Sequence, residues 1–172
     1  MSTNVSTIAS MSSINRNSLL RSIALGGVML AIAQLIIGEW FLYSVVDKTP
    51  FEIVLQYVTS GAFGMSAFQD GTDAALLGVL LHFLISCVIA GVFILSADRI
   101  PLLRRYAIAG VYGVGVYFVM NYVVIPFSAA PPLPDPTTRQ FIERIIEHGL
   151  VIGLTLGIVV QPNANLTKWL SR

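Results

Sequence analysis

Four long apolar runs dominate this sequence and leave few folds open to it. They lie at about residues 22–46, 73–97, 106–126 and 139–160, and each reaches the roughly 20 residues that a helix needs to cross a bilayer. Only 11% of the 172 residues are charged, against about 25% in a typical soluble domain. The sequence therefore predicts an all-α fold, a four-helix transmembrane bundle, and argues against a water-soluble monomer.

An additional helix is expected at about residues 50–62, between the first two spans. Thr49 can cap this helix, Pro50 can take its first position, and Glu52 can reach back as a capping-box partner. Its apolar residues recur at helical spacing, and its other side carries Glu52, Gln56, Thr59 and Ser60. Glycines interrupt it before it reaches the length of a span. We expect an interfacial or re-entrant helix on the outer face of the bundle.

The remaining segments complete the domain organisation. Residues 1–18 are rich in Ser, Asn and Thr and hold almost no apolar cluster, so we expect a disordered cytoplasmic tail. The membrane domain covers residues 19–162, and residues 163–172 form a second cytoplasmic tail. Thr137 and Gln140 stand at capping-box spacing and open the fourth span.

The basic residues predict the orientation of the bundle. Four spans put both termini on one side, where seven of the ten Lys and Arg residues fall: Arg16, Arg21, Arg99, Arg104, Arg105, Lys168 and Arg172. Basic residues accumulate on the cytoplasmic side of membrane proteins. We therefore expect a multi-pass protein with both termini in the cytoplasm.

The few polar residues inside the spans are expected to share one layer. Glu39, His82 and Asn121 lie on stripes of small residues repeated at every fourth position, which predicts that they face the bundle interior. Glu147 and His148 lie beside a similar stripe in the fourth span. At ~1.5 Å per residue, the four spans place these groups roughly 9 to 14 Å below the outer surface of a ~30 Å core. Ionisable groups at that depth are costly, so these five residues are the candidate intramembrane polar cluster.

Three interpretations of this cluster stay open. The groups hold the helices together by interhelical hydrogen bonds, or Glu39, His82, Glu147 and His148 form a proton or ion pathway. In the third, His82 and His148 ligate a haem iron, or join Glu39 and Glu147 around a metal. No ligand-spacing motif assigns a metal or cofactor, and no phosphate loop, H-E-x-x-H or G-x-S-x-G motif assigns a catalytic residue.

Composition also limits the partners. A net charge of +1 offers no basic surface for nucleic acid, so the lipid bilayer is the expected partner. The stripe of Gly149, Gly153 and Gly157 allows packing within the chain or against a second copy. A homo-oligomer or a partner membrane subunit is therefore left open. We expect a non-enzymatic structural or partner-binding membrane component. The alternative is a small transporter or channel component, and a haem- or metal-binding redox subunit is less favoured.

Three short motifs carry a resemblance to known proteins: His82-Phe83-Leu84-Ile85, Tyr112-Gly113 and Met120-Asn121-Tyr122-Val123-Val124-Ile125-Pro126. Through them the chain resembles a group of small, uncharacterised bacterial inner-membrane proteins over roughly residues 55–160, and the stretch from Asn121 to Pro126 is the most specific part. The resemblance implies a location in the bacterial cytoplasmic membrane and a four-span bundle. It implies no activity, substrate or cofactor.

Overall fold

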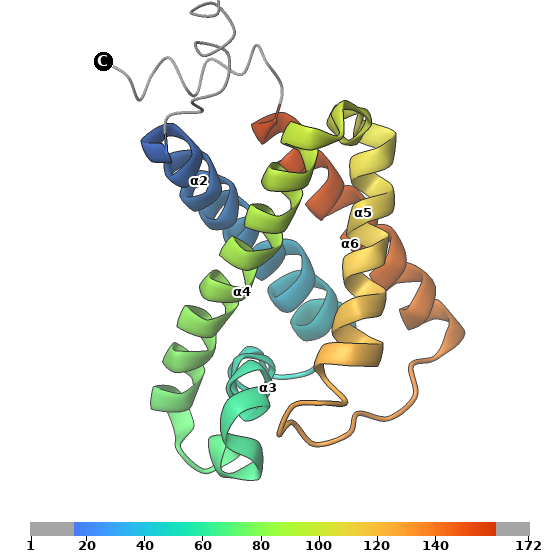
Figure 1. Ribbon diagram of the computed structural model, residues 1–172. Coiled ribbons are helices and arrows are strands. Elements are labelled where there is room, and N and C mark those ends of the chain that lie inside the picture. The colour runs from blue at the N-terminus through green and yellow to red at the C-terminus, as the bar shows by residue number, and fades with distance from the viewer. Residues whose placement is uncertain (1–15, 161–172) are drawn as a thin grey trace, which may run out of the picture.

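The structure, a computed structural model, describes residues 16–160, and within that range it is built from helices without any strand (Figure 1). The elements in chain order are α2 (Arg16–Gln34), η1 (Leu35–Val46), α3 (Phe51–Phe63), η2 (Gly64–Phe68), α4 (Gly71–Arg99), η3 (Pro101–Arg104), α5 (Tyr106–Val119), η4 (Met120–Val124) and α6 (Thr138–Val159). The all-α prediction is confirmed for this range. The two expected tails lie outside it, except that residues 16–18 belong to α2.

Three helical segments are long and apolar enough to cross a membrane: Leu19–Val46, Gly71–Arg99 and Tyr106–Val124. The side of α4 that faces away from the protein is a row of exposed apolar residues, Leu76, Leu80, Leu84, Val88 and Val92. Such a surface is stable in lipid and unstable in water. The chain therefore fits a membrane protein. α6 is not among the three segments, because Arg139, Glu143, Arg144 and Glu147 lie in its first half.

The helices pack in a chain of neighbours. α5 packs on α6, α6 also packs on α2, and α2 packs on α4. α3 lies against the first half of α4, at the end of the molecule that also holds the long connection from α5 to α6 (Figure 1). α2 begins and α6 ends at the opposite end. Leu30, Phe93, Ile152 and Leu156 form the fully buried centre.

Close packing of α5 on α6 depends on glycines. A Cβ atom at Gly153 would lie 2.6 Å from the Cα of Gly110, and one at Gly157 would lie 2.6 Å from the Tyr106 ring. Both distances are shorter than any ordinary carbon contact, so only glycine fits at these two positions. The glycine stripe of α6 thus packs within the chain.

Of the two capping boxes expected from the sequence, one is present. The Thr137 hydroxyl accepts a hydrogen bond from the Gln140 backbone N–H, and the Gln140 side chain accepts one from the Thr137 N–H, which confirms that prediction. The prediction of a capping box at Thr49 was wrong. Pro50, with ψ 131°, is itself the cap residue of α3, so the Thr49 side chain lies outside the first turn. The Glu52 carboxylate instead accepts a hydrogen bond from Thr72, 3.3 Å away on α4.

The polar side of α3 faces the protein. The Gln56 side-chain amide donates to the Gly71 carbonyl at 2.9 Å, and the Thr59 hydroxyl donates to the Ala74 carbonyl at 2.6 Å. Gln56, Thr59 and Ser60 are all buried, whereas apolar residues of α3 and η2 are exposed, among them Ile53, Phe63 and Met65. α3 therefore buries its polar side chains together with Val54 and Leu55, and its other large apolar residues stay exposed.

Candidate polar site between the helices

Two of the expected cluster residues lie on π-helical segments. Glu39 belongs to η1 and Asn121 to η4, where backbone bonds span five residues, as from the Asp47 N–H to the Leu42 carbonyl at 2.9 Å. π-Helical turns are rare and occur frequently at functional sites. They also change the face of the helix on which later residues lie.

Glu39 and His82 lie across the interface between the first span and α4. The carboxylate oxygen Oε1 of Glu39 is 3.9 Å from Nδ1 of His82, and the two side chains are only 17% and 12% exposed. The other ring nitrogen, Nε2 of His82, is buried without a hydrogen-bond partner. The two helices are thus linked by a close polar pair that leaves one nitrogen unsatisfied.

Glu147 and His148 are neighbours on α6. Oε2 of Glu147 lies 2.6 Å from Nδ1 of His148, yet both carboxylate oxygens of this buried residue lack a partner in hydrogen-bond geometry. The same Nδ1 lies 3.0 Å from the backbone carbonyl of Arg144. A carbonyl can only accept, so Nδ1 carries the hydrogen.

Glu147 also reaches the first span. The position that a Cβ would take at Gly38 lies 3.4 Å from Oε1 of Glu147 and 3.9 Å from Oε1 of Gln34. Glu39 lies within Coulombic range of Glu147, His148 and Arg144. Four of the five expected residues therefore interact across three helices: Glu39, His82, Glu147 and His148.

Asn121 stays apart from these four. Its side-chain amide donates to the Tyr117 carbonyl at 2.9 Å, one turn back along the chain. No ion pair or hydrogen bond within residues 16–160 joins it to the other four. Tyr117 is buried instead, with its ring centroid 5.3 Å from that of His148 in an edge-on contact.

A buried ion pair beside the cluster escaped the sequence analysis. Asp47 accepts hydrogen bonds from Arg144 and, at 2.9 Å, from Arg139. The side chains of Asp47 and Arg144 are 7% and 6% exposed. The Arg144 guanidinium also lies over the Tyr43 ring, 3.5 Å from its centroid. These contacts join the end of η1 to the first turns of α6.

One sequence signal pointed to this pair. Asp47 directly follows the first apolar run, and Arg144 stands one turn before His148, at the corresponding end of the fourth run. Opposite charges at corresponding ends of two expected spans would have suggested the contact.

The buried part of the site holds more carboxyl groups than guanidinium groups. Asp47, Glu39 and Glu147 are carboxylic acids, and Arg144 is the buried guanidinium, which Asp47 engages directly. In the described part of the chain, no three His, Cys, Asp or Glu side chains are grouped so as to hold a metal ion.

Comparisons with protein families, with curated proteins and with solved structures find no match for this chain.

Proposed function

We propose that the chain is a four-span protein of a bacterial cytoplasmic membrane, and that it acts as a non-enzymatic structural or partner-binding component. In this proposal α6 is the fourth span and both termini are cytoplasmic. The bacterial location follows from the resemblance carried by His82 to Ile85 and Met120 to Pro126.

One observation about α6 carries the proposal. Its exposed side is an unbroken row of apolar residues at every fourth position, namely Ile142, Ile146, Leu150, Leu154 and Ile158, each 43% to 56% exposed. Its charged Arg144 and Glu147 are buried against the rest of the protein. A helix exposed to water has the opposite arrangement. At ~1.5 Å per residue, α6 is about 33 Å long, enough to cross the ~30 Å core.

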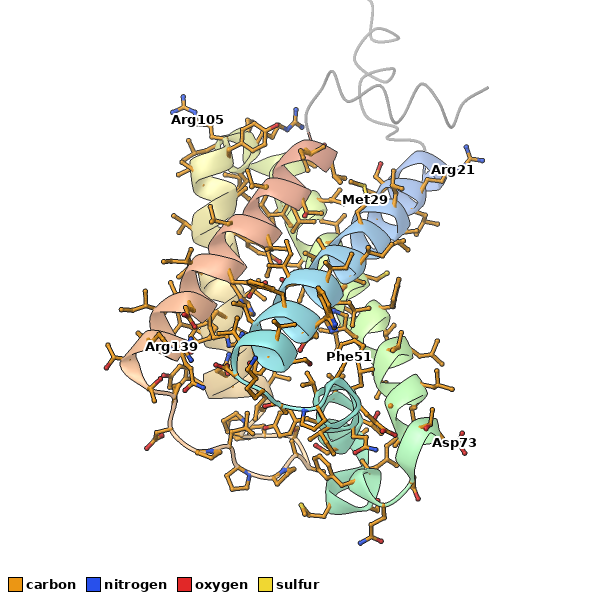
Figure 2. The ribbon with its side chains drawn as sticks, turned by 180° about the vertical axis from the view of Figure 1, so that it is seen from behind. Arg21, Met29, Phe51, Asp73, Arg105 and Arg139 are labelled. Atoms are coloured by element: carbon orange, nitrogen blue, oxygen red, sulfur yellow. The ribbon has the colours of Figure 1, made fainter. Side chains whose placement is uncertain are left out.

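The distribution of charge supports the orientation. Figure 2 shows Arg21 and Arg105 at one end of the molecule and Asp73 and Arg139 toward the other. Arg99 ends α4, and Arg104 ends the short η3 segment that leads to Arg105. The more basic end is the cytoplasmic one under the positive-inside rule.

For α3 we propose the re-entrant alternative, with the segment on the outer side of the membrane. Its buried polar side bonds to the first turns of α4, and its exposed side presents Phe51, Ile53 and Phe63. Backbone and polar side chains are tolerated at membrane depth when protein covers them. Figure 2 shows Phe51 and Asp73 in the same half of the molecule, with Phe51 nearer its middle.

The structural role is supported by the Asp47–Arg144 pair. It joins the first span to α6 in a site closed to solvent, where an unpaired charge would be costly. Together with the Glu39–His82 contact, it links three helices near one level.

A second candidate function is a proton pathway or a small transporter component. The observation that favours it is a set of buried polar atoms without hydrogen-bond partners: both oxygens of Glu147, Oε1 of Gln34, Nε2 of His82 and Nη1 of Arg144. Buried groups of this kind usually bind water or a ligand.

Two experiments test these proposals. Reporter fusions at the two termini, combined with maleimide labelling of Asp135→Cys in a Cys87→Ser background, should place both termini inside and residue 135 outside. Termini on opposite sides would overturn the four-span topology. Proteoliposomes containing a pH dye then separate the functions: a proton flux that is lost in Glu147→Gln favours the second candidate, and absence of flux from folded protein favours the first.

A further inference from the structure

The short turn between α4 and α5, residues 99–106, presents both arginines and apolar side chains on its surface. It contains η3. Arg99 and Arg105 are exposed. Between them, Ile100 and Leu102 are 52% and 50% exposed. A surface that mixes guanidinium groups with large aliphatic side chains suits a membrane interface better than it suits water or hydrocarbon alone.

Two other side chains of the turn fix its backbone. Nε of Arg104 donates a hydrogen bond to the Ala97 carbonyl at 3.2 Å, which closes the turn onto the last residues of α4. Leu103 packs against the buried core. The exposed side chains of the turn are therefore carried on a backbone that the fold already holds in place.

The charge at this end of the molecule is positive. Asp98 is the only acidic residue between positions 74 and 134, and its carboxylate lies 4.0 Å from Nη2 of Arg104. Neither Arg99 nor Arg105 forms an ion pair within residues 16–160. Figure 2 shows Arg21 at the same end as Arg105. This end of the molecule therefore attracts anions.

The apolar neighbours of the arginines favour a lipid over a dissolved anion. A dissolved phosphate ion would gain nothing from Ile100 and Leu102. Exposed apolar residues continue from the turn along both helices, with Leu95 and Val92 on α4 and Val111 on α5. A phospholipid has the matching order of groups, because its phosphate lies at the membrane surface and its acyl chains lie below.

We propose that the turn binds the head groups of anionic phospholipids, with Arg99 and Arg105 on the phosphate groups and the two exposed aliphatic side chains against the upper acyl chains. Each basic residue close to an anionic membrane surface contributes about fivefold to binding. The proposal rests on the proposed topology, in which α4 and α5 are spans that meet at the cytoplasmic surface. It deepens the partner-binding function by naming a class of lipid.

Quenching of tryptophan fluorescence by brominated lipid tests the proposal. Trp40→Phe with Trp169→Phe removes both native tryptophans, so Leu102→Trp becomes the only one in the full chain. This protein is reconstituted into mixtures of phosphatidylglycerol and phosphatidylcholine in which one or the other lipid carries bromine on its acyl chains. The two quenching curves give the binding of phosphatidylglycerol relative to phosphatidylcholine. We expect a preference of about fivefold or more for phosphatidylglycerol.

Phe63→Trp in the same background is the matched control, at the opposite end of α4. Phe63 lines a cleft together with Asp70 and Asp73, so a tryptophan there should show no preference for the anionic lipid. Arg99→Gln with Arg105→Gln should lower the preference at position 102 to about that of the control. Arg99→Lys with Arg105→Lys keeps the charge and should keep most of the preference.

The contrary outcomes are separable. Equal quenching by both lipids at position 102, or a preference that survives the glutamine variant, would overturn the proposal and leave the topology standing. Absence of quenching by either lipid would overturn the topology as well, because the turn would then lie outside the lipid. Loss of the preference on adding sodium phosphate at constant ionic strength would assign the site to dissolved phosphate and overturn the lipid proposal. If the glutamine variant does not fold, Asp98→Asn replaces it as the test and should raise the preference, and an unchanged or lower preference would overturn the proposal.

Discussion

Removing the charge of Asp47 should destabilise the bundle strongly, because it breaks the buried ion pair with Arg144. Asp47→Asn keeps the shape of the side chain but leaves Arg144 buried without its counter-charge. Breaking one partner of a buried pair costs about 3–5 kcal/mol, and the side chains of this pair are only 6% and 7% exposed. The exposed Arg139–Glu143 pair gives the matched control: its side chains are 53% and 33% exposed, so Glu143→Gln should cost about 0.3–0.5 kcal/mol.

Unfolding in mixed micelles with increasing dodecyl sulfate, followed by circular dichroism, measures both changes. The double variant Asp47→Leu with Arg144→Met removes the whole pair and leaves no unpaired charge. It should therefore lie closer to the wild type than either single variant. A cost below about 1 kcal/mol for Asp47→Asn, or a double variant that loses the sum of the two single costs, would refute a buried, coupled pair.

Three further predictions concern other parts of the fold. Gly153→Ala should lower the free energy of unfolding by about 1–3 kcal/mol in the same assay, because the new Cβ would meet the backbone of Gly110. The control Gly115→Ala has open space around it and should be neutral or stabilising by up to about 1 kcal/mol. Thr59→Val should cost about 0.5–1.5 kcal/mol by removing the bond that holds α3 to α4, and proteolysis between the two helices should accelerate. Burial raises the pKa of Tyr57, so its phenolate should appear in ultraviolet titration only above the pH of a free tyrosine. The unfolded state ionises first, so the stability that Tyr57 contributes is present below pH ~10 and falls as pH rises further; a titration unchanged by Tyr57→Phe would contradict this.

The helical fold could be predicted because apolar run length and helix-start chemistry are local properties. Thr137 and Gln140 lie three residues apart, and their capping box follows from that spacing. The pairing of Asp47 with Arg144 joins residues that are far apart in sequence, and no local pattern encodes it. Only an explicit comparison of the charged residues at the ends of the expected spans could have suggested it.

The π-helical segments limit what spacing can predict. Placing Asn121 by a repeat of four residues assumes regular α-helical geometry. η4 bonds over five residues, as from the Ile125 N–H to the Met120 carbonyl, and this alters the face on which its residues lie. Asn121 bonds back to Tyr117, and Tyr117 takes the buried place. Widened helical turns have no clear sequence signature, so this shift could not be foreseen.

The buried polar side of α3 was also beyond a local pattern. An amphipathic helix shows two faces in the sequence, but not which of them meets protein and which meets lipid. The acceptors that decide this for Gln56 and Thr59 are the backbone carbonyls of Gly71 and Ala74, which every residue possesses.

The Asp47–Arg144 contact has a consequence for biogenesis. An isolated arginine at the centre of an inserting helix costs roughly 2.5–3.5 kcal/mol at the translocon, and α6 carries two arginines and two glutamates. Asp47, the countercharge of Arg144, is synthesised almost a hundred residues earlier, at the end of the first span. We therefore expect α6 to enter the lipid stably only when the first span is still beside it at the translocon. Insertion of the first span and of α6 is then one cooperative event.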